Sequence, residues 1–526
     1  MTHDRRIAAP FRTTDRDPMS TPSELAFPRR ASLFRLSKSK FLAGLQCPKR
    51  LYLEVHHPEL ATEPDEQTRA ILDMGMLVGE LARQRFPGGV LVEADHRHAK
   101  DALRRTAELL ADPAVPAVFE GAIEFEDVLV RVDILERIAD SDGLGAWRLI
   151  EVKSSTRVKD VHVDDLAIQS YVLRGAGLTV SDACLLHVNT QYVYDGGDLD
   201  LEQFFTAEDV TERTLGLVAD VPGRLQAMRA TLAAPGPPGI EPDAHCHTPY
   251  ECPFWTHCTE QKPARWIYFL PGGDRTFRHL AARGITTVDE IPPDVKLTVV
   301  QRRVKDDVEW VSGGLKSALS TVRYPVHHLD FETFMPAIPR FPQTRPYQAI
   351  PTQWSNHVET EDGTVVHHEY LCGDPRDPRE ELAVALLDSV GREGSVCVYS
   401  SFERHILESL VDAVPSLKQE LEAVMARLWD LRQIIKEHYY HPAFRGSYSI
   451  KAVLPALVPS LDYDDLAIQE GGVAALHYYR MVFEETDLVE RARIREALLK
   501  YCARDTQAML ELRRVLWEKA NNGREA

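Results

Sequence analysis

The sequence predicts an α/β protein built from two α/β domains and a small helical region between them. Segments rich in β-branched residues with strand-like alternation occur at 128–138 and 147–155 and again at 326–334. A stiff Pro/Gly-rich linker at 233–242 separates the two groups of strands. The chain has 526 residues, which is more than one hydrophobic core usually serves, so two or three domains are expected.

Composition and charge indicate an ordinary soluble globular protein, with 44% apolar and 27% charged residues. No apolar run approaches the roughly 18 residues that span a bilayer, and no apolar segment that could act as a secretion signal follows the start. We therefore expect a cytoplasmic protein without a membrane partner. The net charge of −19 argues against a large basic surface for nucleic acid. Residues 28–60 are nevertheless basic, either as a solvated face and tail or as a phosphate contact.

The N-terminal half divides into a predicted leader and a first α/β domain. Residues 1–33 are rich in Arg, Thr, Pro and Ser and are predicted to be disordered. The domain at 34–260 begins with a helix that Ser37 can cap, followed by a helix at about 68–85 that ends at Pro-Gly-Gly. After the two strands come a helix at 164–174 and a further strand beginning near residue 183.

The remaining chain is predicted to hold a connector and a second domain. Residues 261–322 form a small helical region, in which LAARGITTVDEIP resembles a helix-hairpin-helix turn; a plain connecting helical pair is the favoured interpretation. The second domain covers residues 323–520, with strands at 326–334, 365–371 and 395–400 and mainly helices after them. Strands followed by helices are typical of a mixed α/β domain.

Two carboxylates and a lysine lie on the first predicted strand pair. Asp133 is in the first strand and Glu151 in the second, and polar and glycine residues between them indicate a hairpin turn. Lys153 is two residues after Glu151, so strand alternation places both side chains on one face. Carboxylates suit Mg²⁺ or Mn²⁺, which lowers the pKa of an attacking water, and a nearby lysine stabilises developing charge. An exposed hairpin that merely carries charges is the simpler reading of E-x-K alone.

This D…E-x-K pattern resembles the PD-(D/E)XK nucleases, in particular their RecB-like branch. That branch carries a Gln on the following helix, and Gln169 in DLAIQSYVL fits this position, with Tyr171 close behind. The resemblance covers residues 34–230 and implies a restriction-endonuclease-like core whose catalytic site contains both carboxylates, the lysine and the glutamine. RecB-like sites often begin with G-x-x-x-H on a helix, whereas this chain has Gly79 in place of the His, beside Glu80 as a candidate replacement.

Four cysteines flank the first domain. Cys246, Cys252 and Cys258 are spaced by five residues each in HCHTPYECPFWTHC, and Cys47 lies before the core. The three later cysteines alone suit a zinc site with neighbouring histidines. One cysteine before the core and three after it resembles the iron–sulfur nucleases of the AddB and CRISPR-associated RecB-like groups. The resemblance implies a 4Fe–4S cluster that joins the two ends of the domain; zinc, or no metal, are the alternatives.

A second carboxylate constellation lies in the C-terminal domain. Strand alternation places Asp330 and Glu332 of LDFET on one face of a strand. Tyr501 and Asp505 of YCARD are four residues apart on a helix, so they are neighbours on its surface. Three or four carboxylates that converge on two cations form a two-metal phosphodiester site. Each pattern alone is common on strands and helices that have no catalytic role.

The order D-x-E, acid, Y-x-x-x-D resembles the DnaQ-like exonucleases of the RNase H-like fold. In that branch the middle acid is an Asp after an aromatic residue, whereas VYSSFE offers Glu403, and Asp430 in LWDLR competes with it. The resemblance implies metal ligation by the acids and positioning of the attacking water by Tyr501. Lys451 is either a phosphate contact or a solvated helix residue. Because Glu403 has a longer side chain than the usual Asp, the alternative is a vestigial domain that binds a nucleic-acid strand without cleaving it.

Over residues 34–520 the architecture resembles a bacterial family in which an iron–sulfur RecB-like nuclease precedes an RNase H-like exonuclease domain. The resemblance implies a metal-dependent nuclease in DNA processing or repair, with a second site that trims ends in the 3′ to 5′ direction. DNA is favoured over RNA, and a helicase as a partner is left open. The alternative is a nucleic-acid-binding adaptor with inactive nuclease folds. An iron–sulfur electron carrier would leave both carboxylate sites unexplained.

Overall fold

The computed structural model of the protein describes residues 34–93, 98–138 and 145–522. The predicted disordered leader at 1–33 and most of the predicted hairpin turn, residues 139–144, lie outside the described residues. In the described part, the protein is a mixed α/β structure with a large sheet near each end of the chain.

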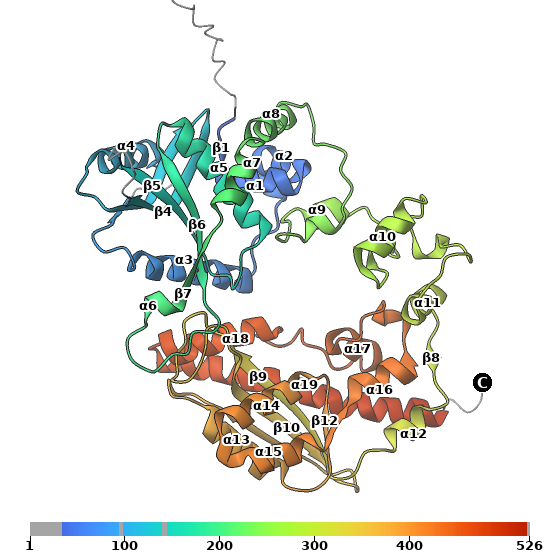
Figure 1. Ribbon diagram of the computed structural model, residues 1–526. Helices are drawn as coiled ribbons and strands as arrows, with labels where there is room; N and C mark the ends of the chain where they lie inside the picture. The colour runs from blue at the N-terminus through green and yellow to red at the C-terminus, as the bar shows by residue number, and fades with distance from the viewer. Residues whose placement is uncertain (1–33, 94–97, 139–144, 523–526) are drawn as a thin grey trace, which may run out of the picture.

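Three regions follow one another along the chain: the N-terminal region (residues 34–260), the connector (residues 261–322) and the C-terminal region (residues 323–522). Figure 1 shows the N-terminal and C-terminal regions one above the other, with the connector descending along one side. No helix among the described residues is both long enough and apolar enough to cross a membrane.

The N-terminal sheet has the strand order β2-β3-β4-β5-β6-β7, and β1 pairs with the start of β4. β3, β4 and β5 are antiparallel neighbours, whereas β5 and β6 are parallel, with the helix α5 between them in the chain. The strands are β1 (Leu36–Ser37), β2 (Val90–Leu91), β3 (Ala117–Phe125), β4 (Val128–Ile138), β5 (Ala146–Lys153), β6 (Val180–Val188) and β7 (Phe205–Asp209).

The predicted first helix is in fact two helices. Ser37 caps the first of them as predicted, with its hydroxyl accepting from the Lys40 backbone N–H at 3.3 Å. Pro48 disfavours helical backbone at Cys47, so the helix ends there and a second one starts. The helices of this region are α1 (Lys38–Gln46), α2 (Pro48–His56), η1 (Pro58–Leu60), α3 (Glu66–Arg83), α4 (Ala99–Ala111), α5 (Asp160–Gly175), α6 (Leu201–Phe204), α7 (Thr211–Val218), α8 (Val221–Leu232), η3 (Ala244–Cys246) and α9 (Trp255–Thr259).

The connector shares a hydrophobic core with the C-terminal region. Trp266 and Leu315 of the connector are buried in one cluster with Tyr439 and Tyr440. Within residues 261–322 the turn at Gly284 leads from α10 into a three-residue 3-10 helix, not into a second α-helix of a helix-hairpin-helix. The elements are η4 (Ile267–Phe269), α10 (Gly273–Ala281), η5 (Val288–Glu290), α11 (Val299–Asp306), β8 (Trp310–Val311) and α12 (Leu315–Leu319).

The C-terminal sheet has the order β11-β10-β9-β12-β13. β9, β10 and β11 are antiparallel neighbours, and β12 runs parallel to both β9 and β13. The predicted strand at 326–334 coincides with β9, whereas β10 was not predicted. The strands are β9 (Val326–Phe334), β10 (Ile350–Glu359), β11 (Val365–Leu371), β12 (Ser395–Val398) and β13 (Leu428–Asp430), and a separate pair joins β14 (Tyr439–Tyr440) to β8.

Helices pack on the C-terminal sheet, and the longest of them, α19, lies against β9 and β10. Several hydrogen bonds join α19 to β10; for example, Gln353 Nε2 donates to the Leu498 carbonyl at 2.9 Å, and the hydroxyls of Ser355 and Thr506 are 2.8 Å apart. The helices are α13 (Arg379–Val390), α14 (Phe402–Ala413), η6 (Pro415–Leu417), α15 (Lys418–Met425), α16 (Leu431–His438), η7 (Pro442–Phe444), α17 (Ile450–Leu457), α18 (Gly471–Tyr479), η8 (Arg480–Glu484) and α19 (Leu488–Asn522).

The loop from β9 to β10, residues 335–349, docks on the N-terminal region. Ala337 of this loop is fully buried in an apolar cluster made otherwise of N-terminal side chains. Backbone hydrogen bonds join Tyr194 N–H to the Thr344 carbonyl at 3.0 Å and Gln343 N–H to the Tyr194 carbonyl at 2.7 Å. Because apolar burial and backbone pairing act together there, the two regions are held in a fixed relation at this loop.

Candidate active sites and a cysteine-lined cavity

Asp133 lies where β5 separates from β4. The pairing of the two strands begins at Ile134 and Ile150, so Asp133 and Glu151 are the first residues beyond it. The Asp133 carboxylate accepts a hydrogen bond from the Val152 backbone N–H at 2.8 Å, which satisfies a donor that β4 no longer pairs. The structure therefore brings the two predicted carboxylates to one place at the strand ends.

Glu151 is the centre of a buried polar network. Its carboxylate accepts from Lys153 Nζ at 2.5 Å, as expected for side chains on one face of a strand. Gln169 Nε2 of α5 donates to it at 2.8 Å and to Asp165 at 3.0 Å, and Lys153 also reaches Asp165 at 2.9 Å. Lys38 Nζ of α1 donates to the same Glu151 oxygen as Lys153, Oε1, at 2.9 Å and to Oε2 at 3.1 Å. All predicted members thus meet, together with two more side chains.

The pKa values of the two carboxyl groups of this site, Asp133 and Glu151, are shifted in opposite directions. Burial, together with the neighbouring Glu151 carboxylate, raises the pKa of Asp133 to about 7. Burial opposes ionisation of Glu151 as well, but the ammonium groups of Lys153 and Lys38 outweigh it and hold the pKa of Glu151 well below its usual range. Asp133 is therefore the carboxylate whose ionisation a bound cation would favour most.

The sequence prediction missed Lys38 and Asp165 in this site. Asp165 is four residues before Gln169, so helical spacing was an available signal for it. Lys38 had no local signal, because its partner Glu151 is 113 residues away. Glu80, the candidate replacement for the missing histidine, is wrong for that role: its side chain is 64% exposed and pairs with Arg83. Tyr171 also faces away from the site, with its hydroxyl on Glu126 at 2.7 Å.

The four predicted cofactor cysteines line one small cavity. Cys47 comes from the junction of α1 and α2, Cys246 from η3 and Cys258 from α9, with Cys252 in the loop between them. Cys252 N–H donates to the Cys246 carbonyl at 2.8 Å, which closes the loop around the cavity. Burial raises the pKa of the Cys246 thiol to about 11. Among the described residues, no three of these sulfurs lie within 4.8 Å of one another.

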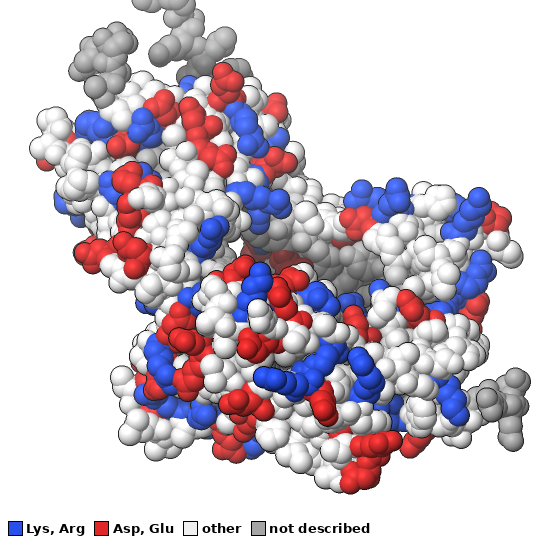
Figure 2. All heavy atoms as spheres, turned by 60° about the horizontal axis from the view of Figure 1, so that its bottom comes forward, with Lys and Arg blue, Asp and Glu red and all other residues white. Residues whose placement is uncertain are grey.

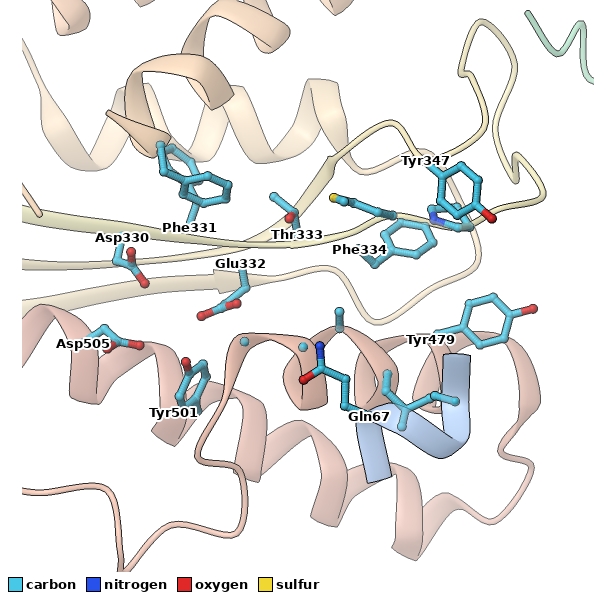
Figure 3. A pocket seen from close by; sticks show the side chains of 18 of the residues that line it. Gln67, Asp330, Phe331, Glu332, Thr333, Phe334, Tyr347, Tyr479, Tyr501 and Asp505 are labelled. Carbon is cyan, nitrogen blue, oxygen red and sulfur yellow. The ribbon is translucent and has the colours of Figure 1, made fainter. Parts of the chain in front are cut away.

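In the C-terminal region, Asp330 and Glu332 project from β9 toward α19. Figure 3 shows their carboxyl groups facing Asp505 and Tyr501 of that helix. A β-bulge at Thr352 of β10 lies between the Glu332–Gln353 and Thr333–Pro351 pairs, and such bulges commonly re-aim side chains beside active sites. Ligand atoms of Asp330 and Glu332 lie within 4.8 Å of each other and of the Cys502 sulfur.

The acids of this second site repel one another. Burial and the carboxyl groups of Asp505, Glu332 and Glu403 raise the pKa of Asp330 well above its ordinary value. Burial and Asp505 do the same for the pKa of Glu332, whereas burial alone raises the pKa of Asp505 to about 6. No Lys or Arg among the described residues forms an ion pair with any of these four acids. The positive charge of Lys451 lowers the pKa values of Glu332 and Asp505 but does not outweigh burial, so a bound cation would favour ionisation of the cluster.

Of the two candidates for the middle acid, Glu403 is at the site. It lies in the first turn of α14, beside Asp330, and burial raises its pKa to about 7. Asp430 caps α16 instead, accepting from Gln433 N–H at 2.9 Å. The sequence also missed Tyr463, whose hydroxyl donates to Asp505 at 2.5 Å.

A cavity of about 760 Å³ opens in front of these acids. Its walls include Glu332 and Lys451 from the C-terminal region and Gln67 and Ser154 from the N-terminal region. Lys451 Nζ bonds the Gln469 carbonyl at 2.5 Å and lies 5.7 Å from the centre of the Tyr463 ring. Figure 2 shows the surface hollowed between the two regions, with acidic and basic side chains mixed around it.

Comparisons with known proteins identify little of this chain. A family model described as a domain of unknown function (DUF2779) matches residues 327–449, which include Asp330, Glu332 and Glu403. A solved structure titled "Crystal structure of SSO0001" is 13% identical to this chain. The match covers 39% of this chain and 86% of the chain of that structure, with a TM-score of 0.16, which is too low to relate the two folds. The search of curated proteins found no match.

Proposed function

We propose that the protein is a metal-dependent nuclease that hydrolyses phosphodiester bonds in DNA. Its C-terminal site, with Asp330, Glu332, Glu403 and Asp505, acts as a 3′ to 5′ exonuclease centre. Its N-terminal site, with Asp133, Glu151 and Lys153, is a second hydrolytic centre of the PD-(D/E)XK type. DNA processing or repair is the corresponding role.

The observation that carries this proposal is the C-terminal carboxylate cluster on the wall of the large cavity. Acids with raised pKa values and no ion-pairing Lys or Arg among the described residues fit divalent cations, because carboxylate oxygens are the ligands that Mg²⁺ and Mn²⁺ prefer. A cation held there would neutralise a substrate phosphate and lower the pKa of the attacking water. Perturbed acids that line a cavity are a common property of catalytic sites.

The side chains around the acids have distinct roles in this proposal. Asp330, Glu332 and Asp505 hold the metal. Tyr501, whose hydroxyl lies beside Glu332, orients the attacking water as a neutral donor, because burial raises the pKa of Tyr501 far above its ordinary value. Lys451 lines the same cavity and contributes positive charge toward the substrate phosphate.

Sheet topology supports both fold assignments. The order β11-β10-β9-β12-β13, with three antiparallel strands followed by two parallel ones, is the arrangement expected of an RNase H-like domain. The antiparallel β3-β4-β5 unit followed by α5 and the parallel β6 is expected of a PD-(D/E)XK core. In both cases two of the candidate acids lie on central strands: Asp133 and Glu151 on β4 and β5, and Asp330 and Glu332 on β9.

The alternative proposal, a nucleic-acid-binding adaptor, is favoured by one feature of the N-terminal site. Lys38 and Lys153 both bond Glu151, so two ammonium groups occupy the space beside the carboxylate that a metal would need. A cation must displace at least one of them before hydrolysis can occur. If neither is displaced, this site binds phosphate without cleaving it.

We further propose that Cys47, Cys246, Cys252 and Cys258 hold a 4Fe–4S cluster. The donor set fits, because four thiols from two distant segments share one cavity. Zinc, with Zn–S bonds of about 2.3 Å, would need sulfurs within about 4 Å of one another. Among the described residues no three of these sulfurs lie within 4.8 Å of one another, which fits a multi-iron cluster held by four thiolates better than a single zinc ion.

Replacing Cys252 with Ser should remove the iron and lower the temperature of unfolding, because the cluster ties the start of the domain to its end. Iron and zinc content and visible absorbance of anaerobically purified protein measure this. Cys184→Ser is the control, because that thiol lies on β6, outside the cysteine-lined cavity. Equal iron content in both variants, or zinc in place of iron, would show that the assignment is wrong.

Stabilisation by Mn²⁺ should be greater at pH 8 than at pH 5. In the folded protein the pKa values of Asp505 and Glu403 are raised to about 6 and about 7, whereas in the unfolded chain they are near 4. Between these two sets of pKa values, the folded protein therefore binds more protons than the unfolded chain. Without metal, stability therefore falls as pH rises through this window. Mn²⁺ binds the deprotonated form and offsets the loss. Thermal unfolding at both pH values, with and without Mn²⁺, tests this; an increase that is equal at both would contradict it.

The proposed activity is tested with labelled single-stranded DNA and Mn²⁺, using protein purified without oxygen. We expect cleavage that a chelator abolishes, with mononucleotides released from the 3′ end. An absence of cleavage of both DNA and RNA, together with tight binding of either, would favour the adaptor.

A further inference from the structure

The helix α3 of the N-terminal region presents an uncovered apolar stripe to the cavity of the C-terminal region. Ile71 and Met74 are at helical spacing and line that cavity, together with the polar Gln67 one turn earlier. The same stripe continues into Val78 and Ala82, which are fully buried in the N-terminal core. Ile71, by contrast, is 62% exposed, so the stripe changes from core to cavity wall along the helix.

α3 is fixed against the site by contacts with α18. Glu66 Oε1 lies 3.1 Å from His477 Nε2, and a Cβ on Gly472 would come within about 2.5 Å of the Gln67 side chain. Gly472 therefore lets α3 approach α18 closely. The preceding Gly471 is in turn near Glu332, since a Cβ there would lie 3.7 Å from its carboxylate. Gly471 and Gly472 of α18 therefore lie between the first turn of α3 and the proposed metal ligand Glu332.

The end of the cavity away from the carboxylates is aromatic and apolar. Tyr347 and Met335 come from the loop after β9, and Tyr479 comes from α18. Figure 3 shows the carboxylates at one end and Tyr347 and Tyr479 at the other, with Gln67 of α3 between them. Ser154, the residue after Lys153, also lines the cavity, and the Tyr347 hydroxyl donates to its carbonyl.

We propose that α3 completes the substrate pocket of the C-terminal site and seats the unpaired terminal nucleotides of a DNA strand. The scissile phosphate lies at Asp330 and Glu332, and the bases lie against Ile71 of α3 and the rings of Tyr347 and Tyr479. This rests on the proposed exonuclease function and adds a substrate-positioning element from the other region of the chain, the helix α3.

Size, chemistry and continuity favour this occupant. A cavity of about 760 Å³ is in the range that takes a small molecule, which corresponds to one or two nucleotides and excludes a duplex. Flat apolar and aromatic walls accept any base by stacking, so the pocket needs no sequence preference. Because the apolar part is continuous with the carboxylates, a strand in it delivers its phosphate to the metal ligands. A protein partner would leave that continuity unexplained.

The test compares Ile71→Ser with Leu72→Ser. Leu72 is the next residue of α3, is 59% exposed, and does not line the cavity, so it matches Ile71 in size, exposure and helix position. Ile71→Ser should raise the KM for single-stranded DNA about tenfold with little change in kcat, whereas Leu72→Ser should leave both unchanged. An oligonucleotide with 2-aminopurine as its 3′-terminal base should change fluorescence on binding wild type and Leu72→Ser, but much less on binding Ile71→Ser.

The possible failures are distinguishable. Equal kinetics and fluorescence in the two variants, with wild type still cleaving, would overturn the role of α3 and leave the exonuclease proposal standing. A wild type that neither cleaves DNA nor changes the fluorescence would overturn both proposals. Unchanged DNA binding with a changed mass of Ile71→Ser in light scattering would assign the stripe to contact with a second copy of the chain.

Discussion

Asn in place of Asp330 should lower the 3′ to 5′ exonuclease rate by roughly 10³-fold or more while making the metal-free protein more stable. The rate falls because Asp330 is a proposed metal ligand, and a metal supplies several kcal/mol of charge stabilisation to the transition state. Stability rises because the substitution removes one of several buried carboxyl groups that raise one another's pKa values. Release of the 3′-terminal label and thermal unfolding without metal measure the two effects.

The control for this prediction is Asp430→Asn. Asp430 is the competing candidate for the middle acid, but it caps α16 and does not line the cavity. Asn caps helices about as well as Asp, so activity and stability should both stay near wild type. The C-terminal site would be misassigned if Asp430→Asn stopped the exonuclease reaction while Asp330→Asn did not. An Asp330→Asn protein that unfolds more easily than wild type would contradict the electrostatic argument.

Substituting Ala for Lys153 should lower the second activity, the cleavage that remains in an Asp330→Asn background, by roughly 10²- to 10³-fold. Lys153 bonds both Glu151 and Asp165, and loss of its ammonium group removes positive charge from beside the proposed metal. The fold should survive with a stability loss of about 1–3 kcal/mol, because Lys38 still pairs with Glu151. Internal cleavage of labelled DNA and urea unfolding measure these effects.

Lys38→Ala is the charge-matched control for Lys153. The two lysine side chains are each 23% exposed and both reach Glu151 and Asp165, so either substitution removes the same charge. A similar loss of stability is therefore expected, but Lys38→Ala should keep cleavage within about tenfold of the parent. If both variants lose cleavage equally, the lysines act together to neutralise Glu151 and neither has a special catalytic role.

Those parts of the sites that are close in sequence could be predicted. Strand alternation correctly placed Glu151 with Lys153, and Asp330 with Glu332, because a two-residue period fixes the face of a strand. Helical spacing placed Tyr501 beside Asp505, because residues four apart on a helix are neighbours on its surface. Mixed α/β structure in both regions followed from the apolar strand segments, and the structure agrees.

The parts that depend on distant contacts could not be predicted. β10 lacks an apolar alternation, because its buried Gln353, Ser355 and Asn356 are polar and form hydrogen bonds to α19 and α13. Lys38 reaches Glu151 only after α1 packs near β5. The contact of α3 with the C-terminal cavity joins Gln67 to residues near 472, and no local pattern predicts it.

Cleavage of 5′- and 3′-labelled single-stranded DNA with Mn²⁺ tests the central claim most directly. Wild type, Lys153→Ala, Asp330→Asn and the double variant, all purified without oxygen, are compared side by side with a chelator control. Two hydrolytic centres predict two product patterns, with stepwise 3′ trimming lost in Asp330→Asn, the other pattern lost in Lys153→Ala, and both lost in the double variant. Wild type that binds DNA but cleaves neither DNA nor RNA would contradict the account, and so would full activity of the double variant.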